Sequence, residues 1–270
     1  MKNLINPGVT VEEALRLRPL LTELFMRRKV GFWEDPHRKM RDLFSRQEPG
    51  AWENFLEELD ALPFPAPDCR WRDLPVAHLL DYLTQNHREF FLEFVFDLHY
   101  KLDVLGLSAT DPLDNVKQLQ SEFRLFAEEL RGLVDWVESH LYPRILRYEA
   151  CLQDSRIHPE FHHGSLQMAV AKRSRHIAGL RQNVFPRLIS LAEGLEADSL
   201  DSTGLTVAKS LESFFERLQA HENLEFDTLF PLGIEMERTL YNSSINGGQP
   251  DFHRVRGPMD SGITRLSTAR

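Results

Sequence analysis

Residues 205–231, LTVAKSLESFFERLQAHENLEFDTLFP, decide the fold class. Apolar side chains recur three and four positions apart along this stretch, which is the spacing of one face of an α-helix. This seam consists of Val207, Leu211, Phe214 and Leu218, and it continues into His221 and Glu225. A helix with such a stripe buries it against other helices. The stretch therefore predicts a bundle helix that carries two polar residues on its core face.

The same spacing runs through three earlier segments of the chain. We expect long helices over residues 75–105, 112–153, 159–197 and 203–242, joined by short loop-like segments. No convincing alternation of apolar and polar residues, the pattern of a half-buried strand, is found. Four long amphipathic helices with short connections predict an all-α protein with an up-and-down four-helix bundle.

The flanking segments set the predicted domain boundaries. Thr10 and Glu13 have the spacing of a capping box that opens a first helix, and Pro19 interrupts that helix. The segment PFPAPDCRWRDL breaks the helical pattern, and the last residues lack apolar periodicity. We predict a small helical N-terminal domain over 1–62, a linker over 63–74, the bundle over 75–244 and a flexible tail over 245–270.

Composition narrows the range of functions. The 270 residues are 42% hydrophobic and 27% charged, which suits a globular protein. The net charge of −9 argues against nucleic acid as a partner, and no apolar run is long enough to span a membrane. The N-terminal MKNLINPGV lacks the apolar stretch of a secretory signal, so we expect a cytoplasmic protein. Only two cysteines, Cys69 and Cys151, are present beside 11 histidines, which favours imidazole and carboxylate as metal ligands.

Three histidines and one carboxylate lie on or beside the seams. His87 takes a seam position in the first long helix, His176 lies at the edge of the third seam, and His221 and Glu225 share one face of the fourth helix. Such groups are costly to bury unless they pair, form hydrogen bonds or bind a metal. Neutral imidazole and carboxylate suit iron, zinc or manganese, so these four residues are the predicted ligands of one ion. A buried His–Glu hydrogen-bonded network without metal would account for the same residues.

A second histidine cluster lies in HPEFHH and comprises His158, His162 and His163. We interpret it as a solvated helix N-terminus that begins near Pro159. A weak internal repeat links ESHLYPRIL (138–146) with EFDTLFPLGI (225–234), because both place an aromatic–proline step after an acidic residue. The two are 88 residues apart, which fits a bundle of two related hairpins, and each proline should kink its helix.

The segment HENLEFDTLFP (221–231) resembles the last ligand helix of hemerythrin-like proteins, in the di-iron branch proposed to repair iron–sulfur centres under nitrosative or oxidative stress. In that family a His-x-x-x-Glu step precedes Leu-Phe-Pro, and both side chains bind iron. WRDLPVAHLLDYL and NHREFF resemble the first bundle helix, SRHIAGL resembles the third, and the stretch from Val9 to Pro36 is similar to the small N-terminal domain. The resemblance covers roughly residues 8 to 243. It implies iron as the cofactor, O2 or NO as the ligand, and His87 and His176 as ligands beside His221 and Glu225.

The chain departs from the family pattern at two places. The second helix should carry another His-x-x-x-Glu, but those positions hold Leu133 and Val137, and Glu138 is about 100° off the seam of an ideal helix. Trp33 and Glu34 stand where the family has a Cys-Cys pair. The departures disfavour a di-iron centre and leave three arrangements: one ion on the four residues named above, a polar core without metal, or substitute ligands among Asp135, Glu138 and His140.

The sequence thus predicts a diverged metal-binding bundle, a sensor or carrier more than a turnover enzyme. The alternative is a metal-free bundle that serves as a protein-interaction or regulatory module, with a protein partner or a second copy of the chain. No Ser/His/Asp constellation, glycine-rich phosphate loop or dinucleotide motif is found, which argues against hydrolases, kinases and dehydrogenases.

Overall fold

The computed structural model describes residues 5–28, 35–44, 50–60, 71, 74–89, 94–108, 114–154, 159, 164–198 and 202–246. These residues are helical almost throughout, and they contain no strand beyond one isolated bridge between Thr10 and Lys39. The predicted all-α class is confirmed. No helix in this part of the chain is long and apolar enough to cross a lipid bilayer.

The N-terminal part forms four short helices around a core of its own: α1 (Val11–Leu17), α2 (Leu21–Arg27), α3 (Met40–Phe44) and α4 (Ala51–Asp60). The predicted capping box opens α1, because Thr10 Oγ1 accepts from the Glu13 amide while Glu13 accepts from the Thr10 amide. Pro19 lies in the break between α1 and α2, as expected. Stacked rings of Phe25 and Phe55, with centroids 5.6 Å apart, lie at the centre of this core.

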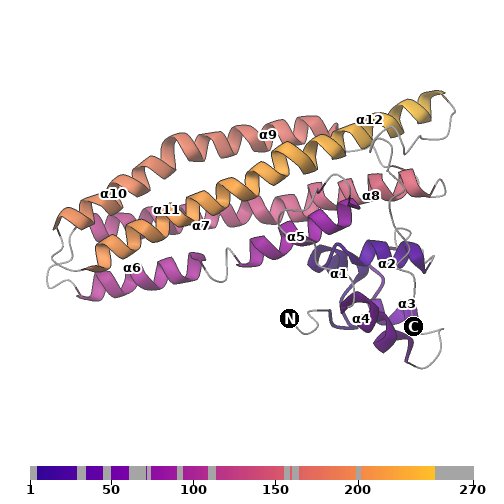
Figure 1. Ribbon diagram of the computed structural model, residues 1–270, viewed down its shortest axis with the longest axis horizontal. Helices are drawn as coiled ribbons and strands as arrows, with labels where there is room; N and C mark the ends of the chain where they lie inside the picture. Colours follow the sequence, from indigo (N-terminus) through magenta and orange to yellow (C-terminus); the bar gives the residue numbers. More distant parts are fainter. Residues whose placement is uncertain are drawn as a thin grey trace, which may run out of the picture.

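Four long helical runs lie side by side along the long axis of the molecule, and successive runs are antiparallel (Figure 1). Run 1 comprises α5 (Val76–Glu89) and α6 (Phe96–Ser108). Run 2 comprises α7 (Asp114–Trp136), the π-helical η3 (Val137–Leu141) and α8 (Tyr142–Gln153). Run 3 comprises α9 (Leu166–Gly179), η4 (Leu180–Val184) and α10 (Phe185–Asp198), and run 4 comprises α11 (Ser202–Leu224), η5 (Glu225–Leu229) and α12 (Phe230–Asn246).

A π-helical turn interrupts each of runs 2, 3 and 4 just before an aromatic–proline step. The amide of the aromatic residue donates five residues back: Tyr142 to Val137, Phe185 to Leu180, and Phe230 to Glu225. The following proline has no N–H and crowds the carbonyl four residues earlier, which favours a wider turn at this point. The sequence predicts continuous helices with kinks at Pro143 and Pro231; the structure adds the extra residue in each turn and a third instance at Pro186.

The runs enclose two apolar cores. One core lies at the end beside the N-terminal helices and includes Leu83, Val137 and Leu229, and the other lies at the far end and includes Phe126 and Leu218. Between them is a set of buried or half-buried polar residues, which we call the polar layer: His87, Glu138, Arg173, His221 and Glu225. Run 4 passes through the far core, the polar layer and the other core in turn, because His221 and Glu225 follow Leu218 of one core and precede Leu229 of the other.

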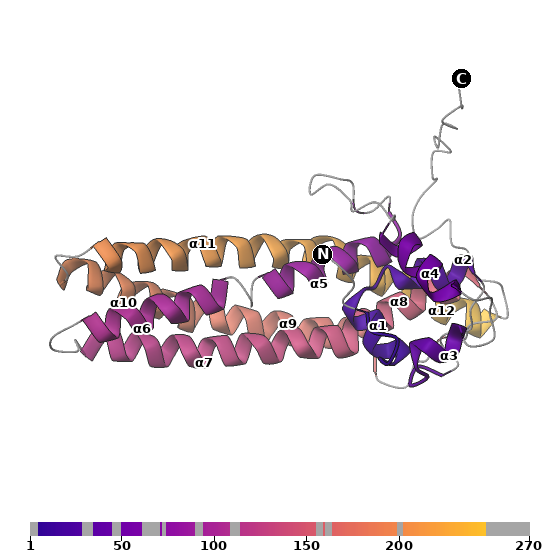
Figure 2. The same cartoon turned by 90° about the horizontal axis from the view of Figure 1, so that it is seen from below.

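The N-terminal helices pack on run 1 and on α8 (Figure 2). Arg18 Nε lies 3.1 Å from Oδ1 of the buried Asp81, and Arg88 donates to the Leu17 carbonyl at 2.8 Å. Most of the predicted linker, Cys69, the His158–His162–His163 cluster and the Trp33–Glu34 step lie outside the described residues. The third run begins at Leu166 instead of residue 159, and run 4 continues to Asn246, so the predicted tail beyond that residue is also outside the described part.

Candidate metal centre

His87, His221 and Glu225 converge from runs 1 and 4. Each offers one ligand atom, and these atoms all lie within 4.8 Å of one another. The two imidazole rings have centroids 4.3 Å apart, and His221 Nε2 lies 3.9 Å from Glu225 Oε1. All three side chains are buried, and Glu225 has an exposed fraction of 0%. Three of the four ligands predicted from the sequence therefore lie together.

Glu138 determines which nitrogen of His87 is available to a ligand. The Oε1 atom of Glu138 lies 2.9 Å from His87 Nδ1. Since an ionised carboxylate can only accept, this contact assigns the proton to Nδ1 and leaves a lone pair on Nε2. His87 Nε2 is buried and has no hydrogen-bond partner among the described residues. Metal-binding histidines usually donate from the other ring nitrogen to a carboxylate, which orients the ring and raises its basicity.

The π-helical turn η3 explains why Glu138 reaches the polar layer. On an ideal helix Glu138 would point about 100° away from the seam that Leu133 and Val137 define. Glu138 is the second residue of η3, where the turn is wider, and its half-buried side chain crosses to run 1. Val137 remains fully buried in the apolar core, as the sequence predicts, and Leu133 is half-buried.

Glu225 is bound from two sides. The Tyr142 hydroxyl donates to its Oε1 at 2.7 Å, and Arg173 Nη1 forms an ion pair with its Oε2. Burial and the neighbouring Glu225 carboxylate raise the pKa of Tyr142 well above its ordinary value, which keeps the phenol a donor. Arg173 is itself only 4% exposed, so a fixed positive charge from run 3 faces this carboxylate.

The environment favours the neutral form of His221. Burial, followed by the proximity of His87 and of Arg173, lowers the pKa of His221 well below its ordinary value. Neutral imidazole is the form that binds transition metals. A protonated His221 would place a second positive charge near Arg173 in a buried region.

The structure does not bring His176 into this group. Its side chain is 44% exposed, and its Nε2 lies 2.6 Å from Oε1 of Glu129 on run 2. The neighbouring Ile177 is buried instead. The sequence prediction for His176 differs from the structure by one residue, which corresponds to about 100° around the helix.

The other proposed substitutes also point elsewhere. Asp135 and His140 are exposed, and His140 Nδ1 lies 3.0 Å from the Trp136 carbonyl on its own run. Cys151 is buried and is not part of the cluster. Of the three substitutes weighed for the second helix, only Glu138 enters the polar layer, and it does so as the partner of His87.

The internal repeat extends to contacts that the sequence alone does not reveal. Glu149 accepts from the amide of Val76, the first residue of run 1, and Glu237 accepts from the amide of Leu166, the first residue of run 3. Glu149 and Glu237 are 88 residues apart, as are Tyr142 and Phe230. Under this correspondence His221 and Glu225 match Leu133 and Val137, and His87 matches Ile177. The polar ligands thus lie on runs 1 and 4, whereas the matching positions on runs 3 and 2 hold apolar side chains.

The donor set fits one transition-metal ion. Two imidazoles and one carboxylate with open positions are typical of non-haem iron sites, and zinc and manganese use the same donors. Within the described part of the chain this is the group of His, Cys, Asp and Glu residues that is close enough to hold an ion. Arg173 disfavours metal binding, because its positive charge already balances the Glu225 carboxylate when no cation is present.

Comparisons with known proteins do not assign the chain. No protein-family model matches it, and no curated protein matches it. Its function is therefore inferred from the residues themselves and from the geometry of the polar layer.

A small pocket between runs 1 and 4 borders the His221 side chain. It has a volume of about 240 Å³, and its lining residues include His221 together with Tyr82, Asn86, Phe94, Arg217, Ala220 and Leu224. The guanidinium of Arg217 lies over the Phe94 ring, 4.5 Å from its centroid. This volume is enough for a molecule of a few atoms beside His221.

Proposed function

We propose that this chain is a diverged hemerythrin-like bundle that binds one iron ion through His87, His221 and Glu225. The observation that carries the proposal is the state of His87, which is grouped with His221 and Glu225. Its Nδ1 is held by Glu138, while its buried Nε2 has no hydrogen-bond partner in the described part of the chain. Leaving such a nitrogen buried is unfavourable unless a ligand occupies it. A cation at this point would satisfy it.

The residues of the chain have separate roles in this proposal. Glu138 fixes the tautomer of His87, while Tyr142 and Arg173 hold the Glu225 carboxylate in place. The pocket beside His221 is large enough for a diatomic molecule. When bound, an iron ion would supply open coordination positions for such a ligand, with O2 and NO as the candidates that the family resemblance suggests. We infer a cytoplasmic sensor or carrier in oxidative or nitrosative stress, or in iron–sulfur repair, and not a turnover enzyme.

One ion, not two, agrees with the donors available. The positions that repeat His221, Glu225 and His87 in the other half are Leu133, Val137 and Ile177, which cannot bind a metal. Glu138 is engaged with His87, and Glu225 is the one carboxylate in the three-residue cluster. A carboxylate-bridged pair of irons would need a second bridging carboxylate from run 2.

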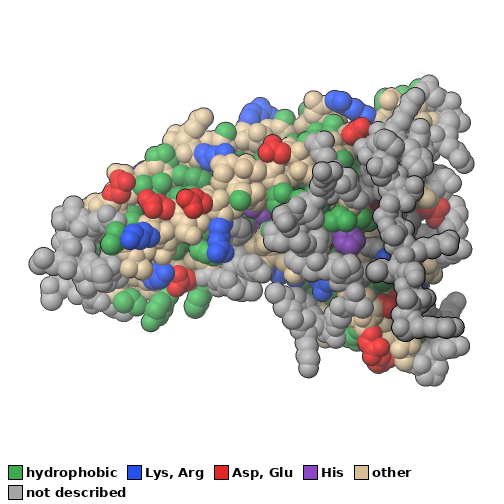
Figure 3. Space-filling view, in the orientation of Figure 1, with side chains coloured by type: hydrophobic (Ala, Val, Ile, Leu, Met, Phe, Trp, Pro, Cys, Tyr) green, Lys and Arg blue, Asp and Glu red, His purple; other side chains and the backbone are tan. Residues whose placement is uncertain are grey.

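The ion pair between Arg173 and Glu225 favours a second candidate, a metal-free bundle that acts as a protein-interaction or regulatory module. A bundle with this pair has a balanced core charge without any cation. An outward row of Phe96, Tyr100 and Val104 on α6 would suit a protein partner or a second copy of the chain, since Phe96 is 71% exposed. Figure 3 shows hydrophobic side chains projecting along the edge of the molecule that α6 forms.

Metal content separates the two candidates. The full chain is produced with iron supplied, and its metal content and visible spectrum are measured before and after NO is added. We expect about one iron per chain, lost in His221→Ala and retained in His176→Ala, which removes an exposed imidazole outside the cluster. A metal-free protein of undiminished stability would favour the interaction module, and two irons per chain would contradict the assignment of a single site.

A further inference from the structure

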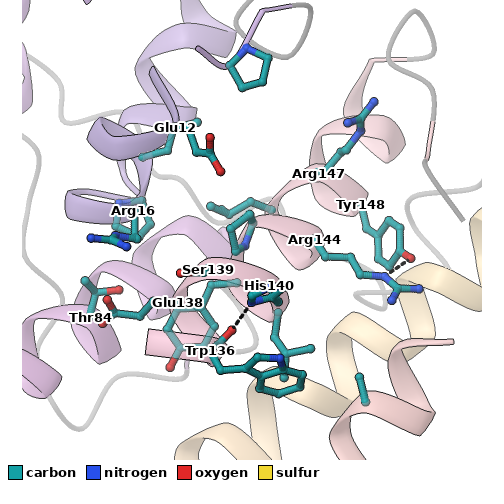
Figure 4. A pocket seen from close by; sticks show the side chains of 18 of the residues that line it. Glu12, Arg16, Thr84, Trp136, Glu138, Ser139, His140, Arg144, Arg147 and Tyr148 are labelled. Atoms are coloured by element: carbon teal, nitrogen blue, oxygen red, sulfur yellow. Dashed lines mark hydrogen bonds between the residues drawn. The ribbon is translucent and has the colours of Figure 1, made fainter. Parts of the chain in front are cut away.

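A large pocket in the described part of the chain lies between the N-terminal helices and the long runs. It has a volume of about 710 Å³ and is bounded by α1, by α5 and by the segment from Trp136 to Tyr148 on run 2 (Figure 4). This volume is within the range of small-molecule sites, which occur preferentially at interfaces between domains. Neither the predicted iron site nor the pocket beside His221 accounts for it.

The walls favour a neutral, mainly apolar occupant. Apolar side chains dominate the lining and include Leu15, Pro19, Leu141, Pro143 and Leu146. Several of the charged residues that line the pocket have a partner of opposite charge or are exposed to solvent. Glu12 lies 3.4 Å from His37, Arg144 is bound by Glu237, and Arg16 is exposed.

Thr84 marks a polar position in this pocket. Its side chain is 1% exposed, lines the pocket, and has an Oγ1 atom without a hydrogen-bond partner among the described residues. A buried hydroxyl without a partner is unfavourable, so this atom calls for a ligand group. Glu138 lines the same pocket, and Figure 4 shows Thr84 and Glu138 on the same side of it.

Aromatic and flat surfaces form another part of the lining. The Trp136 and His140 rings are stacked with centroids 5.8 Å apart, and both residues line the pocket together with Tyr142. Planar ligands pack well on such surfaces.

We propose that this pocket binds a small neutral aromatic molecule with one hydroxyl group. The ligand hydroxyl donates to the Glu138 carboxylate and accepts from the Thr84 hydroxyl once the Thr84 side chain rotates toward the cavity, while the ring system lies against the apolar wall and the Trp136 face. Glu138 can only accept and Thr84 can donate, so a single hydroxyl satisfies both. The site shares Glu138 with the proposed metal centre, but none of its contacts requires an ion, so its test does not depend on that proposal.

The probe is 2-naphthol, an aromatic alcohol whose fluorescence reports its environment. Binding is measured with the full chain after treatment with a chelator, so that metal plays no part. We expect a single saturable site. Thr84→Val removes the hydroxyl at nearly constant shape and should weaken binding roughly five- to tenfold, the effect of one hydrogen bond. Thr22→Val is the matched control, because Thr22 is another buried threonine whose Oγ1 has no partner in the described part of the chain, yet it does not line the pocket.

A second variant tests the location without touching the buried hydroxyl. Ser139 is exposed and lines the pocket, so Ser139→Trp should fill the cavity and abolish binding. Lys209→Trp adds the same side chain at an exposed position outside the pocket and should have no effect. Binding that survives Ser139→Trp, or that responds equally to Thr84→Val and Thr22→Val, would overturn the proposal. Absence of saturable binding to the wild-type chain would overturn it as well, whatever its iron content.

Discussion

Nδ1 of His87 lies 2.9 Å from Oε1 of Glu138, although Glu138 stands beside the apolar seam of its own run. The π-helical turn η3 brings the two together, because the wider turn directs the side chain of its second residue toward run 1. The same contact leaves the lone pair of His87 on Nε2, where a ligand can bind. The π-helical turn therefore determines which nitrogen of His87 is available.

Glu138→Gln should weaken metal binding by about ten- to a hundredfold, the usual effect of removing the outer partner of a metal-bound histidine. The amide no longer carries the charge that raises the basicity of the imidazole. Affinity is measured by competition with a chelator of known strength. Glu129→Gln is the control, because Glu129 also pairs with a histidine, His176, but on the surface. Equal effects of both substitutions would contradict the role given to Glu138.

The sequence identified three of the five residues of the polar layer for a clear reason. His87, His221 and Glu225 interrupt apolar seams at regular helical spacing, and a polar residue on a seam is visible without a structure. Arg173 offered the same signal, since it lies three residues after Val170 and four before Ile177 on the third seam. Arg173 was not predicted, because an arginine among other basic residues is typical of a solvent-exposed helix face.

Glu138 and His176 could not be placed correctly from periodicity. An inserted π-helical residue changes the facing of side chains without changing the composition, so Glu138 looks off-seam in any ideal-helix projection. His176 and Ile177 differ by one position, and the sequence resemblance favoured the histidine while the packing placed the isoleucine inside. The overall helical class needed neither detail, because it depends on the apolar spacing alone.

Arg173→Met should separate stability from metal affinity. Removing one partner of a buried ion pair typically costs about 3–5 kcal/mol, so the metal-free variant should be less stable than the wild-type chain. Glu225 would then be free of its cation, and a bound metal should restore more stability in the variant than in the wild type. Urea unfolding with and without zinc, a redox-inert probe, measures both quantities. Arg175→Met changes an exposed arginine of the same helix and should show neither effect.

Two glycines in the helical runs should respond to alanine with opposite signs. A Cβ on Gly233 would lie 2.8 Å from both Ile145 Cγ1 and Leu166 Cδ2, so Gly233→Ala should overpack the contact between runs and destabilise the chain by about 1–3 kcal/mol. A Cβ on Gly132 would meet nothing within 4 Å. Gly132→Ala should therefore stabilise α7 by roughly 0.5–1 kcal/mol through helix propensity. The midpoints of thermal and urea unfolding test both, and a shift in the same direction for the two variants would contradict the packing at Gly233.

Asp81 should make the attachment of the N-terminal helices dependent on pH. Burial raises the pKa of Asp81 above its ordinary value of 3.8, against the opposing attraction of Arg18 and the hydrogen bonds from Arg18, the Leu20 amide and Gln85. A carboxyl group whose pKa is higher in the folded than in the unfolded state binds more protons when folded. Its contribution to stability therefore falls as pH rises from the unfolded pKa through the folded pKa. Asp81→Asn mimics the protonated form, and its stability relative to wild type should therefore increase from pH 4.5 to pH 7. Urea unfolding at pH 4.5 and pH 7 measures the free energy of unfolding of both proteins. If the stability of Asp81→Asn relative to wild type falls between these pH values, the attraction of Arg18 outweighs burial.

Ile177→His should strengthen metal binding, whereas His176→Ala should leave it unchanged. Helices α5 and α9 are both 14 residues long and begin at equivalent residues of the repeat, so Ile177 corresponds to His87. Ile177 also lies one turn after Arg173, whose side chain reaches Glu225, and the two share a helix face. An imidazole at this position would add a third nitrogen donor from run 3, and we expect an increase in zinc affinity of about tenfold or more, comparable to the effect of one good ligand-supporting contact. Chelator competition provides the affinity, and circular dichroism confirms that the variant keeps its helical content. If His176→Ala lowers the zinc affinity and Ile177→His does not raise it, the register assigned to run 3 and the correspondence between the two halves are both wrong.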